Sequence, residues 1–462
     1  MLQQDQRGRG RRMEGLPTVL PVKARQMLLF KENGSGFSDP AFTENRQEPI
    51  HRWVPWVAGF SSQFVREAIE KHLPKGGTVL DPFAGVGTTL VETIRRGPSY
   101  RAVGFEVNPY AAFAAQTKLD AVAVNPSAFR AAIVRFRRET QTTRPLMPPA
   151  GFRSRVPFFS PRVEAQVLRV LAWMEDLRPA ALLDLFRLAF ASVMVKFSNY
   201  TYEPSLGTRA SAGKPNVEDA PVVLILESKL EEMASDMESF QLECPFPGQG
   251  IVHSRTWRDG EDILGKNSVH LVITSPPYAN NYHYLRNTRP QLWWLGFATS
   301  TDQTREIEEQ SFGKFWQTVR DGPEVKLQFG FELLENLLDR VRHSQNDERI
   351  YGGSGWANYL ATYFNDSFDF LKKLSRILAP GGCALVVIGN SVVQGVEVKT
   401  DEIWAHLAGS KPAGLSVEAL EMVRKKRVGS SILNSSVRSG ASKGVTLYES
   451  VLSLRRRKNR SN

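Results

Sequence analysis

Cysteine is almost absent from the 462 residues, and no apolar run is long enough to cross a bilayer. The two cysteines, Cys244 and Cys383, lie far apart in the sequence, so we expect neither a disulfide framework nor a metal site. The longest apolar helical stretch, residues 180–197, is interrupted by three charged side chains. The Arg-rich start has no apolar signal-peptide core. These absences predict a cytoplasmic protein without a membrane partner.

Acidic residues are the minority among the charged side chains, with 48 Asp and Glu against 59 Lys and Arg and a net charge of +11. A basic chain attracts polyanions, because each phosphate that it neutralises releases a counterion. Part of the excess is clustered in two runs, and such runs often form arms that contact phosphates. The clustered residues are Arg7, Arg9, Arg11, Arg12, Arg455, Arg456, Arg457, Lys458 and Arg460.

A short apolar run at residues 269–273 predicts a buried parallel strand, and Thr274 leads from it into Ser-Pro-Pro-Tyr. Consecutive prolines donate no backbone hydrogen bond and have a fixed φ, so they can direct carbonyl oxygens into a cleft. Beside them, Ser275 supplies a hydroxyl acceptor and Tyr278 a flat face for a base. Acceptors placed at the two N–H bonds of an exocyclic amine would favour its attack on a methyl donor. The structural alternative is a strand closed by a proline turn.

The pattern of residues 78–89 predicts an apolar strand, then a Gly-rich turn and then the start of a helix. Open α/β sheets bind ligands at such a turn. It is not a P-loop, because no Lys follows the glycines, and Leu90 breaks the dinucleotide fingerprint. A second strand, at residues 102–105, ends in Glu106, whose carboxylate can accept hydrogen bonds from both hydroxyls of a ribose.

Together, the TSPPY and DPFAGVGTT segments resemble the catalytic and cofactor loops of the DNA amino-methyltransferases, which methylate an exocyclic amine of cytosine or adenine. The resemblance implies S-adenosylmethionine as cofactor and double-stranded DNA as substrate. It assigns the base-holding, catalytic role to Ser275, Pro276, Pro277 and Tyr278. It assigns cofactor binding to Asp81, Pro82, Phe83, Ala84, Gly85, Gly87, Thr88, Thr89 and Glu106.

Two further positions are carried over from the family. Residues 60–62, Phe-Ser-Ser, offer an N-cap for an amphipathic helix that continues through His72. In the family, a helix placed there helps to hold the methionine end of the cofactor, and this role is carried over to Phe60 and Ser61. Family members often have an Asp after the strand at residues 251–253, where it binds the adenine amine. This chain has Ser and Arg there, and Asp259 and Asp262 are the nearest substitutes.

The resemblance implies an α/β, Rossmann-like class I methyltransferase fold, with a mostly parallel seven-stranded sheet that ends in an antiparallel hairpin. Helical patterns at 162–177, 180–197, 222–240 and 358–378 complete the prediction. The expected divisions are a basic flexible extension (1–48), the cofactor-binding part (49–120), a helical insertion (121–250), the catalytic part (251–285), a candidate target-recognition insertion (286–355), the rest of the methyltransferase domain (356–454) and a basic tail (455–462).

Ser-Pro-Pro-Tyr is more typical of cytosine-N4 enzymes than of adenine-N6 enzymes, so we expect cytosine, with adenine as the alternative. Cytosine C5-methyltransferases need a nucleophilic cysteine after a proline, and neither Cys244 nor Cys383 has that context. Two other functions stay open: methylation of an RNA base or a protein amine, and DNA binding without turnover. A restriction endonuclease or another defence protein is an expected partner.

Overall fold

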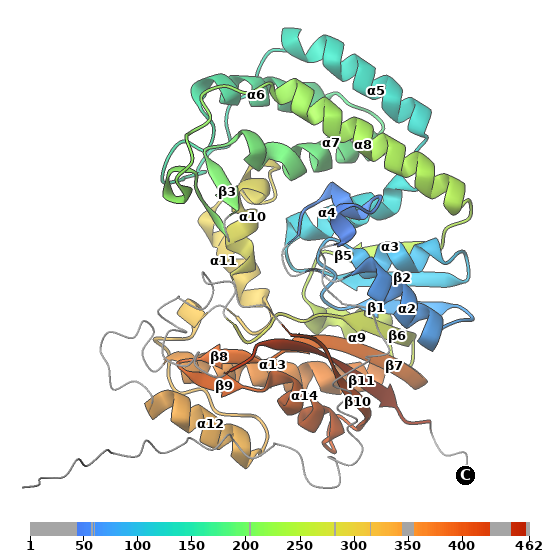
Figure 1. Ribbon diagram of the computed structural model, residues 1–462, viewed down its shortest axis with the longest axis vertical. Coiled ribbons are helices and arrows are strands. Elements are labelled where there is room, and N and C mark those ends of the chain that lie inside the picture. The colour runs from blue at the N-terminus through green and yellow to red at the C-terminus, as the bar shows by residue number, and fades with distance from the viewer. Residues whose placement is uncertain are drawn as a thin grey trace, which may run out of the picture.

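A seven-stranded sheet organises the chain in a computed structural model, which describes residues 44–56, 59, 61–202, 205–280, 283–314, 316–343, 355–425 and 445–458 (Figure 1). The strand order is β10-β11-β7-β6-β1-β2-β5. The strands are β1 (Gly77–Asp81), β2 (Tyr100–Phe105), β5 (Gln249–His253), β6 (Val269–Thr274), β7 (Leu378–Gly389), β10 (Leu415–Lys425) and β11 (Tyr448–Arg456). Phe60, the Arg7–Arg12 cluster and Arg460 lie outside the described residues.

The pairing of the strands confirms the predicted fold class. Strands β5, β2, β1, β6 and β7 pair in parallel. Strand β11 is antiparallel to both of its neighbours, β7 and β10, and therefore lies inside the sheet although it comes last in the sequence. This is the Rossmann-like sheet with a terminal antiparallel hairpin that the resemblance implied.

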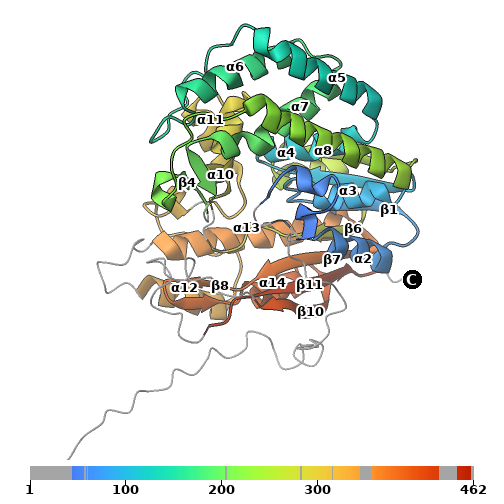
Figure 2. The same cartoon turned by 45° about the horizontal axis from the view of Figure 1, so that its top comes forward.

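Alternating apolar residues bury both faces of the sheet. Val79 and Leu271 point to one face, which α2 (Ser62–His72) covers, beside α3 (Thr88–Arg95) and α4 (Pro109–Ala121). Leu80 and Val272 point to the other face, where α13 (Gly355–Ile377) and α14 (Thr400–Gly409) pack, close to the short α9 (Gly260–Leu264). Because strand side chains alternate between faces, such runs suit a strand that is covered on both sides. Figure 2 shows these layers.

The segment predicted as a helical insertion forms a second layer over α3 and α4 (Figure 2). Its helices are α5 (Pro126–Glu139), α6 (Pro161–Glu175), α7 (Ala180–Val193) and α8 (Val222–Glu243), with a small hairpin of β3 (Tyr200–Tyr202) and β4 (Leu206–Thr208). Helices α5 and α6 both begin with Pro after a capping residue, Asn125 or Ser160, whose side chain accepts a hydrogen bond from a backbone N–H. The helices predicted at 162–177, 180–197 and 222–240 correspond to α6, α7 and α8.

The segment after the catalytic strand divides between the two sides of the molecule. Helix α10 (Tyr284–Trp294) packs on α4, and α11 (Thr301–Gln310) follows it. Helix α12 (Glu332–His343) packs on α13, the helix predicted at 358–378, and next to the hairpin of β8 (Ser391–Val393) and β9 (Val396–Val398). The 3-10 helices are Glu44–Arg46, His51–Trp53, Thr140–Thr142, Met194–Phe197, Ala210–Ala212, Trp257–Asp259 and Trp316–Thr318.

The N-terminal segment is tied to the fold before residue 49, where the predicted extension was to end. Buried Asn45 accepts a hydrogen bond from the backbone N–H of Ser62 (2.9 Å), and Glu48 forms an ion pair with Arg66 (2.8 Å). A few residues later, Asp236 of α8 accepts hydrogen bonds from the backbone N–H of Ile50 and the indole N–H of Trp53. The prediction missed this segment because its anchors are polar side chains, which have no periodic pattern.

The predicted basic tail starts too early, because β11 continues through Arg456. The Arg455 guanidinium pairs with Glu418, and that of Arg456 donates to backbone carbonyl oxygens of Arg376 and Leu378. Both side chains therefore stabilise the end of a strand rather than a flexible arm. In the part of the chain that the structure describes, no helix has the length and apolar character needed to span a membrane.

Candidate active site

A large open cavity lies where β1, β2 and β6 end at the same edge of the sheet. Its volume is about 1510 Å³ when the space open to solvent is included. Cofactor-loop residues Pro82, Phe83 and Gly85 line it, and so does Glu106 after β2. From the predicted catalytic loop, Ser275, Pro277 and Tyr278 line it as well. One cavity thus contains side chains of both loops, as expected at the carboxyl edge of a parallel sheet.

The turn after β1 has a backbone that requires glycine at two positions. Gly85 has φ 51° and Gly87 has φ 86°, in the left-handed region where a side chain is strained. A Cβ on Gly87 would also lie 2.9 Å from the Cβ of Ala115 in α4. Gly87 directly precedes α3, so the turn brings the start of that helix close to the sheet. The cavity-lining backbone at Gly85 stays open to a ligand on one side and faces Trp56 on the other.

Asp81, at the end of β1, joins the cofactor loop to the catalytic loop. One carboxylate oxygen accepts a hydrogen bond from the Thr89 hydroxyl (2.7 Å), and the other from the Thr274 hydroxyl (2.7 Å) and the Phe83 N–H (3.1 Å). Asp81 is 1% exposed and is not among the residues that line the cavity. Burial raises the pKa of its carboxyl to about 6. In this structure its contacts are with the two loops that form the cavity.

Glu106 is held with its carboxylate facing the same cavity. One oxygen accepts from the Gly85 N–H (2.8 Å) and the other from the Asn108 N–H (2.8 Å). Each oxygen keeps a further lone pair, so a pair of ribose hydroxyls can still donate to it. Burial raises the pKa of Glu106 to about 7, and the backbone N–H groups act in the opposite direction.

The catalytic loop follows β6 and places Tyr278 beneath the last strand. The Tyr278 hydroxyl donates to a carboxylate oxygen of Glu449 in β11 (3.2 Å), and the Ser275 hydroxyl is 3.5 Å from the Tyr278 oxygen. Burial is the main cause that raises the pKa of Tyr278, with Glu449 adding to it. Tyr278 is therefore a neutral phenol whose hydroxyl is tied to the sheet while its ring borders the cavity.

The remaining predicted site residues lie behind the cavity wall. Thr88 and Thr89 are buried at the start of α3, and Ser61 is buried just before α2. Among the described residues, none forms a hydrogen bond with the Ser61 hydroxyl. The residues outside the cavity lining are Ser61, Asp81, Ala84, Gly87, Thr88, Thr89 and Pro276.

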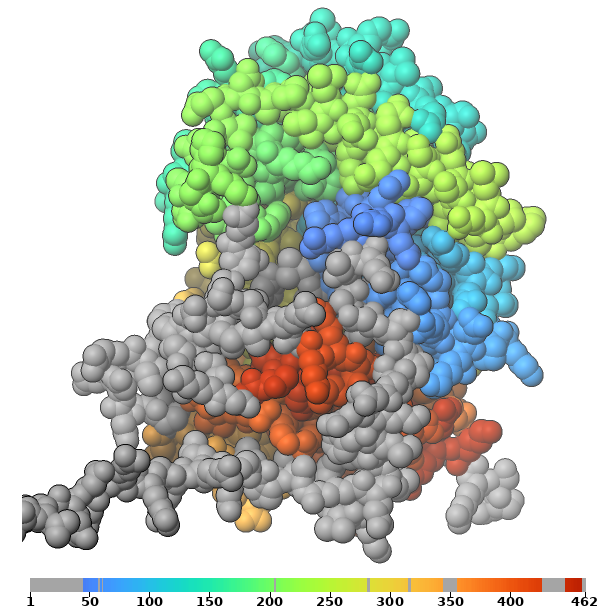
Figure 3. Space-filling model, viewed as in Figure 1, coloured from blue at the N-terminus to red at the C-terminus, as the bar shows by residue number. Residues whose placement is uncertain are grey.

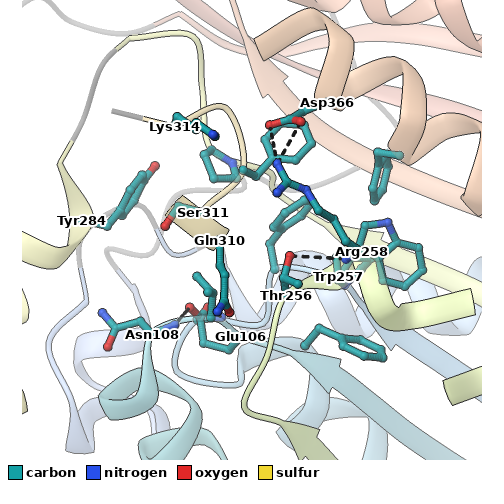
Figure 4. A pocket seen from close by; sticks show the side chains of 18 of the residues that line it. Glu106, Asn108, Thr256, Trp257, Arg258, Tyr284, Gln310, Ser311, Lys314 and Asp366 are labelled. Carbon is teal, nitrogen blue, oxygen red and sulfur yellow. Dashed lines mark hydrogen bonds and ion pairs between the residues drawn. The ribbon is translucent and has the colours of Figure 1, made fainter. Parts of the chain in front are cut away.

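Several lining residues come from segments that carried no motif. After β5, Thr256, Trp257 and Arg258 face the cavity, and Arg258 pairs with Asp366 of α13 (3.0 Å; Figure 4). The Trp257 ring packs edge-on against Phe105 (5.5 Å between centroids). Neither Asp259 nor Asp262, the suggested substitutes for the missing Asp, is among the described lining residues. A Trp soon after a strand end is the only local signal that could have marked this corner.

The insertion after the catalytic loop closes the opposite side of the cavity. Gln310, at the end of α11, extends toward Glu106 in Figure 4. The Phe312 ring meets the ring of Phe83 from the cofactor loop edge-on (5.1 Å between centroids). Near them, His283 and Glu308 form a pair across the cavity wall (2.5 Å). The segment predicted to read DNA therefore also encloses the cofactor loop.

The donor set fits S-adenosylmethionine. A carboxylate with free lone pairs suits the ribose hydroxyls, and the aromatic corner of Phe105 and Trp257 suits an adenine ring. When bound, this cofactor supplies an electrophilic methyl group. Glu106, Gly85 and residues of the catalytic loop line the cavity in which it would bind.

Comparisons with known proteins agree with this reading. The family model described as DNA methylase (N6_N4_Mtase) matches residues 31–117. Type II methyltransferase M.BsoBI of Geobacillus stearothermophilus is 22% identical over 457 residues, which cover 88% of this chain and 87% of that protein. Type II methyltransferase M.AvaI of Anabaena variabilis is 22% identical over 414 residues, 82% of each chain.

Among solved structures, the rRNA methyltransferase aviRa from Streptomyces viridochromogenes aligns over 87% of each chain, with 10% identity and a TM-score of 0.30. The fold assignment does not depend on that alignment, because the strand order and pairing directions carry it. The two loops, the sheet edge that unites them and the sequence matches therefore make this chain similar to the S-adenosylmethionine-dependent DNA amino-methyltransferases.

Proposed function

We propose that this DNA methyltransferase transfers the methyl group of S-adenosylmethionine to the N4 amine of a cytosine in a specific site of duplex DNA. The observation that supports it most directly is the single cavity in which Glu106 and Gly85 face Ser275 and Tyr278. Asp81 fixes the two loops relative to each other. A cofactor held by Glu106 and Gly85 would therefore present its methyl group to a base held by the catalytic loop.

In the proposed mechanism, the target base leaves its stack and rests on the ring of Tyr278, which costs the duplex a few kcal/mol. The Ser275 hydroxyl and loop carbonyl oxygens accept hydrogen bonds from the amine and favour its pyramidal form. When bound, S-adenosylmethionine would supply an electrophilic methyl group to the amine nitrogen and leave as S-adenosylhomocysteine, and the amine would then release its extra proton to solvent water. No covalent enzyme intermediate is required.

The cysteines support direct transfer rather than C5 chemistry. Burial raises the pKa of the Cys383 thiol to about 12 and also raises that of Cys244. Neither thiol lines the cavity. A thiol nucleophile of the C5 type needs an accessible thiolate beside the base, which neither residue offers.

The choice of cytosine rests on Ser275 in the first position of the loop, since an Asp there is more typical of adenine-N6 enzymes. We also propose that residues 286–355 contact the DNA, because α11 and the turn after it border the cavity. A restriction endonuclease or another defence protein that acts on the same site is the proposed partner.

The test is product identification. Purified protein is incubated with S-adenosylmethionine and unmethylated DNA, and the DNA is digested to nucleosides for mass spectrometry. N4-methylcytosine supports the proposal, and N6-methyladenine overturns the choice of base. Parallel incubations with RNA and protein substrates detect the alternative acceptors. Absence of any methylated product from protein that binds the cofactor would favour a DNA-binding module without turnover.

A further inference from the structure

A second cavity adjoins the large open cavity of the candidate active site, which we call the methyl-transfer cavity. Its volume is about 920 Å³ with the space open to solvent, and we call it the side cavity. Trp56 and Tyr284 line both cavities, so the two share a wall. The side cavity has no lining residue from the catalytic loop among the residues that the structure describes. A ligand in it would therefore lie beside the reacting base and not in its place.

The wall of the side cavity contains a buried amide with an unused acceptor. Gln291 of α10 is 4% exposed, and its Nε2 donates to the Ala191 carbonyl (3.3 Å) and to the Tyr202 oxygen (3.2 Å). Its Oε1 has no hydrogen-bond partner among the described residues. A buried carbonyl without a partner costs free energy. Because Oε1 itself has almost no accessible surface, a ligand N–H recovers this free energy only when the Gln291 side chain turns its oxygen toward the side cavity.

The other walls suit a flat ring. Four aromatic side chains from separate segments line the side cavity: Trp56, Tyr110, Tyr202 and Tyr284. Bases of any sequence can stack on such rings. Exposed Arg46 also lines this cavity and offers a positive charge to a phosphate. Aromatic faces, an inner acceptor and a cation match a nucleotide unit better than a free apolar ligand.

A chain of hydrogen bonds connects the side cavity to Glu106, the carboxylate proposed to bind the cofactor. Thr288, one turn before Gln291, accepts a hydrogen bond from Asn108 Nδ2 (2.8 Å). The backbone N–H of Asn108 in turn donates to Glu106 (2.8 Å). A ligand in the side cavity would thus be connected, through Thr288 and Asn108, to Glu106, the carboxylate proposed to bind the ribose.

We propose that the side cavity binds a second unstacked base of the substrate DNA, which presents an N–H to Gln291 Oε1 while the target base is in the methyl-transfer cavity. This inference rests on the proposed function, because it requires DNA as the substrate. It also predicts that the enzyme distorts its site at two nucleotides and not one.

The experiment begins with the recognition site, which is mapped from the methylated DNA product. Duplexes then carry a fluorescent base analogue, 2-aminopurine or pyrrolocytosine, at one position at a time across the site and its flanks. Wild-type protein should raise the fluorescence at the target and at one second position. Gln291→Met should abolish the rise at the second position and keep the rise at the target.

Gln241→Met is the matched control, since Gln241 is also a carboxamide whose Nε2 donates two hydrogen bonds, in its case to the backbone carbonyls of Val122 and Val124. A variant-free test uses wild-type protein and a duplex with a mismatch at the second position. A mismatched base costs less to extrude and can still occupy the side cavity, so binding should tighten by roughly tenfold. A rise at the target alone, with normal methylation, would overturn the inference but leave the proposed function intact, whereas absence of DNA methylation would overturn the proposed function itself.

Discussion

The two sides of the methyl-transfer cavity are held by different forces. On the sheet side, buried carboxylates fix the loops: Asp81 ties β1 to the start of α3 and the end of β6, and Glu106 ties the glycine turn to Asn108. On the opposite side, the insertion meets the cofactor loop through ring packing of Phe312 with Phe83. Hydrogen bonds fix both distance and direction, whereas ring packing tolerates small shifts. We infer that the hydrogen bonds on the sheet side fix the cofactor loop more strictly than this ring contact does.

The largest expected effect on stability and activity comes from Asp81→Ala, on the sheet side. The substitution removes the acceptor of three hydrogen bonds and leaves two buried hydroxyls without it, so we expect a loss of about 3 kcal/mol in the free energy of unfolding. Methyl transfer should fall sharply because the two loops are no longer linked. Urea denaturation measures the first effect and a labelled-methyl assay the second. Wild-type stability in this variant would contradict the described role of Asp81.

Glu106→Gln, also on the sheet side, should reduce cofactor affinity much more than it reduces the free energy of unfolding. A neutral amide cannot accept charge-assisted hydrogen bonds from both ribose hydroxyls, so cofactor affinity should fall by about 10- to 100-fold. The unfolding free energy should fall by only about 1 kcal/mol, because the new amide nitrogen leaves one of the Gly85 and Asn108 N–H donors without an acceptor, whereas the burial that opposed the charged carboxylate no longer applies. Calorimetry with S-adenosylmethionine measures the affinity. Unchanged affinity would remove Glu106 from the proposed cofactor site.

Phe312→Ala probes the insertion side. Removal of a partly buried ring should cost about 2 kcal/mol of unfolding free energy, less than the loss of a fully buried Phe. The cofactor should dissociate faster, with only a several-fold loss of affinity. Stopped-flow measurement of dissociation tests this, and Phe329→Ala, a change in a ring that packs on Phe368 away from the cavity lining, is the control. An affinity loss as large as that of Glu106→Gln would show that the two sides are equally strict.

The last prediction is a pH dependence of cofactor binding, which needs no substitution. With a Glu106 pKa of about 7 in the free protein, the carboxylate that accepts the ribose hydroxyls is mostly present above pH 7 and is lost as the pH falls. Cofactor affinity should therefore drop by roughly tenfold between pH 8 and pH 6. The raised pKa acts oppositely on folding, since the folded state binds the proton more tightly. Calorimetry at both pH values tests the slope, which should disappear in Glu106→Gln.

The sheet side could be predicted from sequence and the insertion side could not. Gly85, Glu106 and Tyr278 stand in short motifs directly after strands, so local order along the chain places them. Phe312 reaches the cavity through packing against α13, which leaves no local pattern, and Trp257 follows β5 in a segment that carries no motif. The same limit explains the early start of the predicted tail, because a run of arginines hides the end of β11.

The position of β11 has a consequence for the newly made chain. Strand β10 pairs with no other strand of the sheet than β11, and Tyr278 donates its hydroxyl to Glu449 of β11, among the described residues. The pairing of β10 and the hydrogen bond of Tyr278 can therefore form only after residues 448–456 have been synthesised. A translation product that stops before them would contain the cofactor turn but an incomplete catalytic half. The catalytic half of the sheet therefore folds only after β11 is available, although β1, β2 and the cofactor turn come early in the chain.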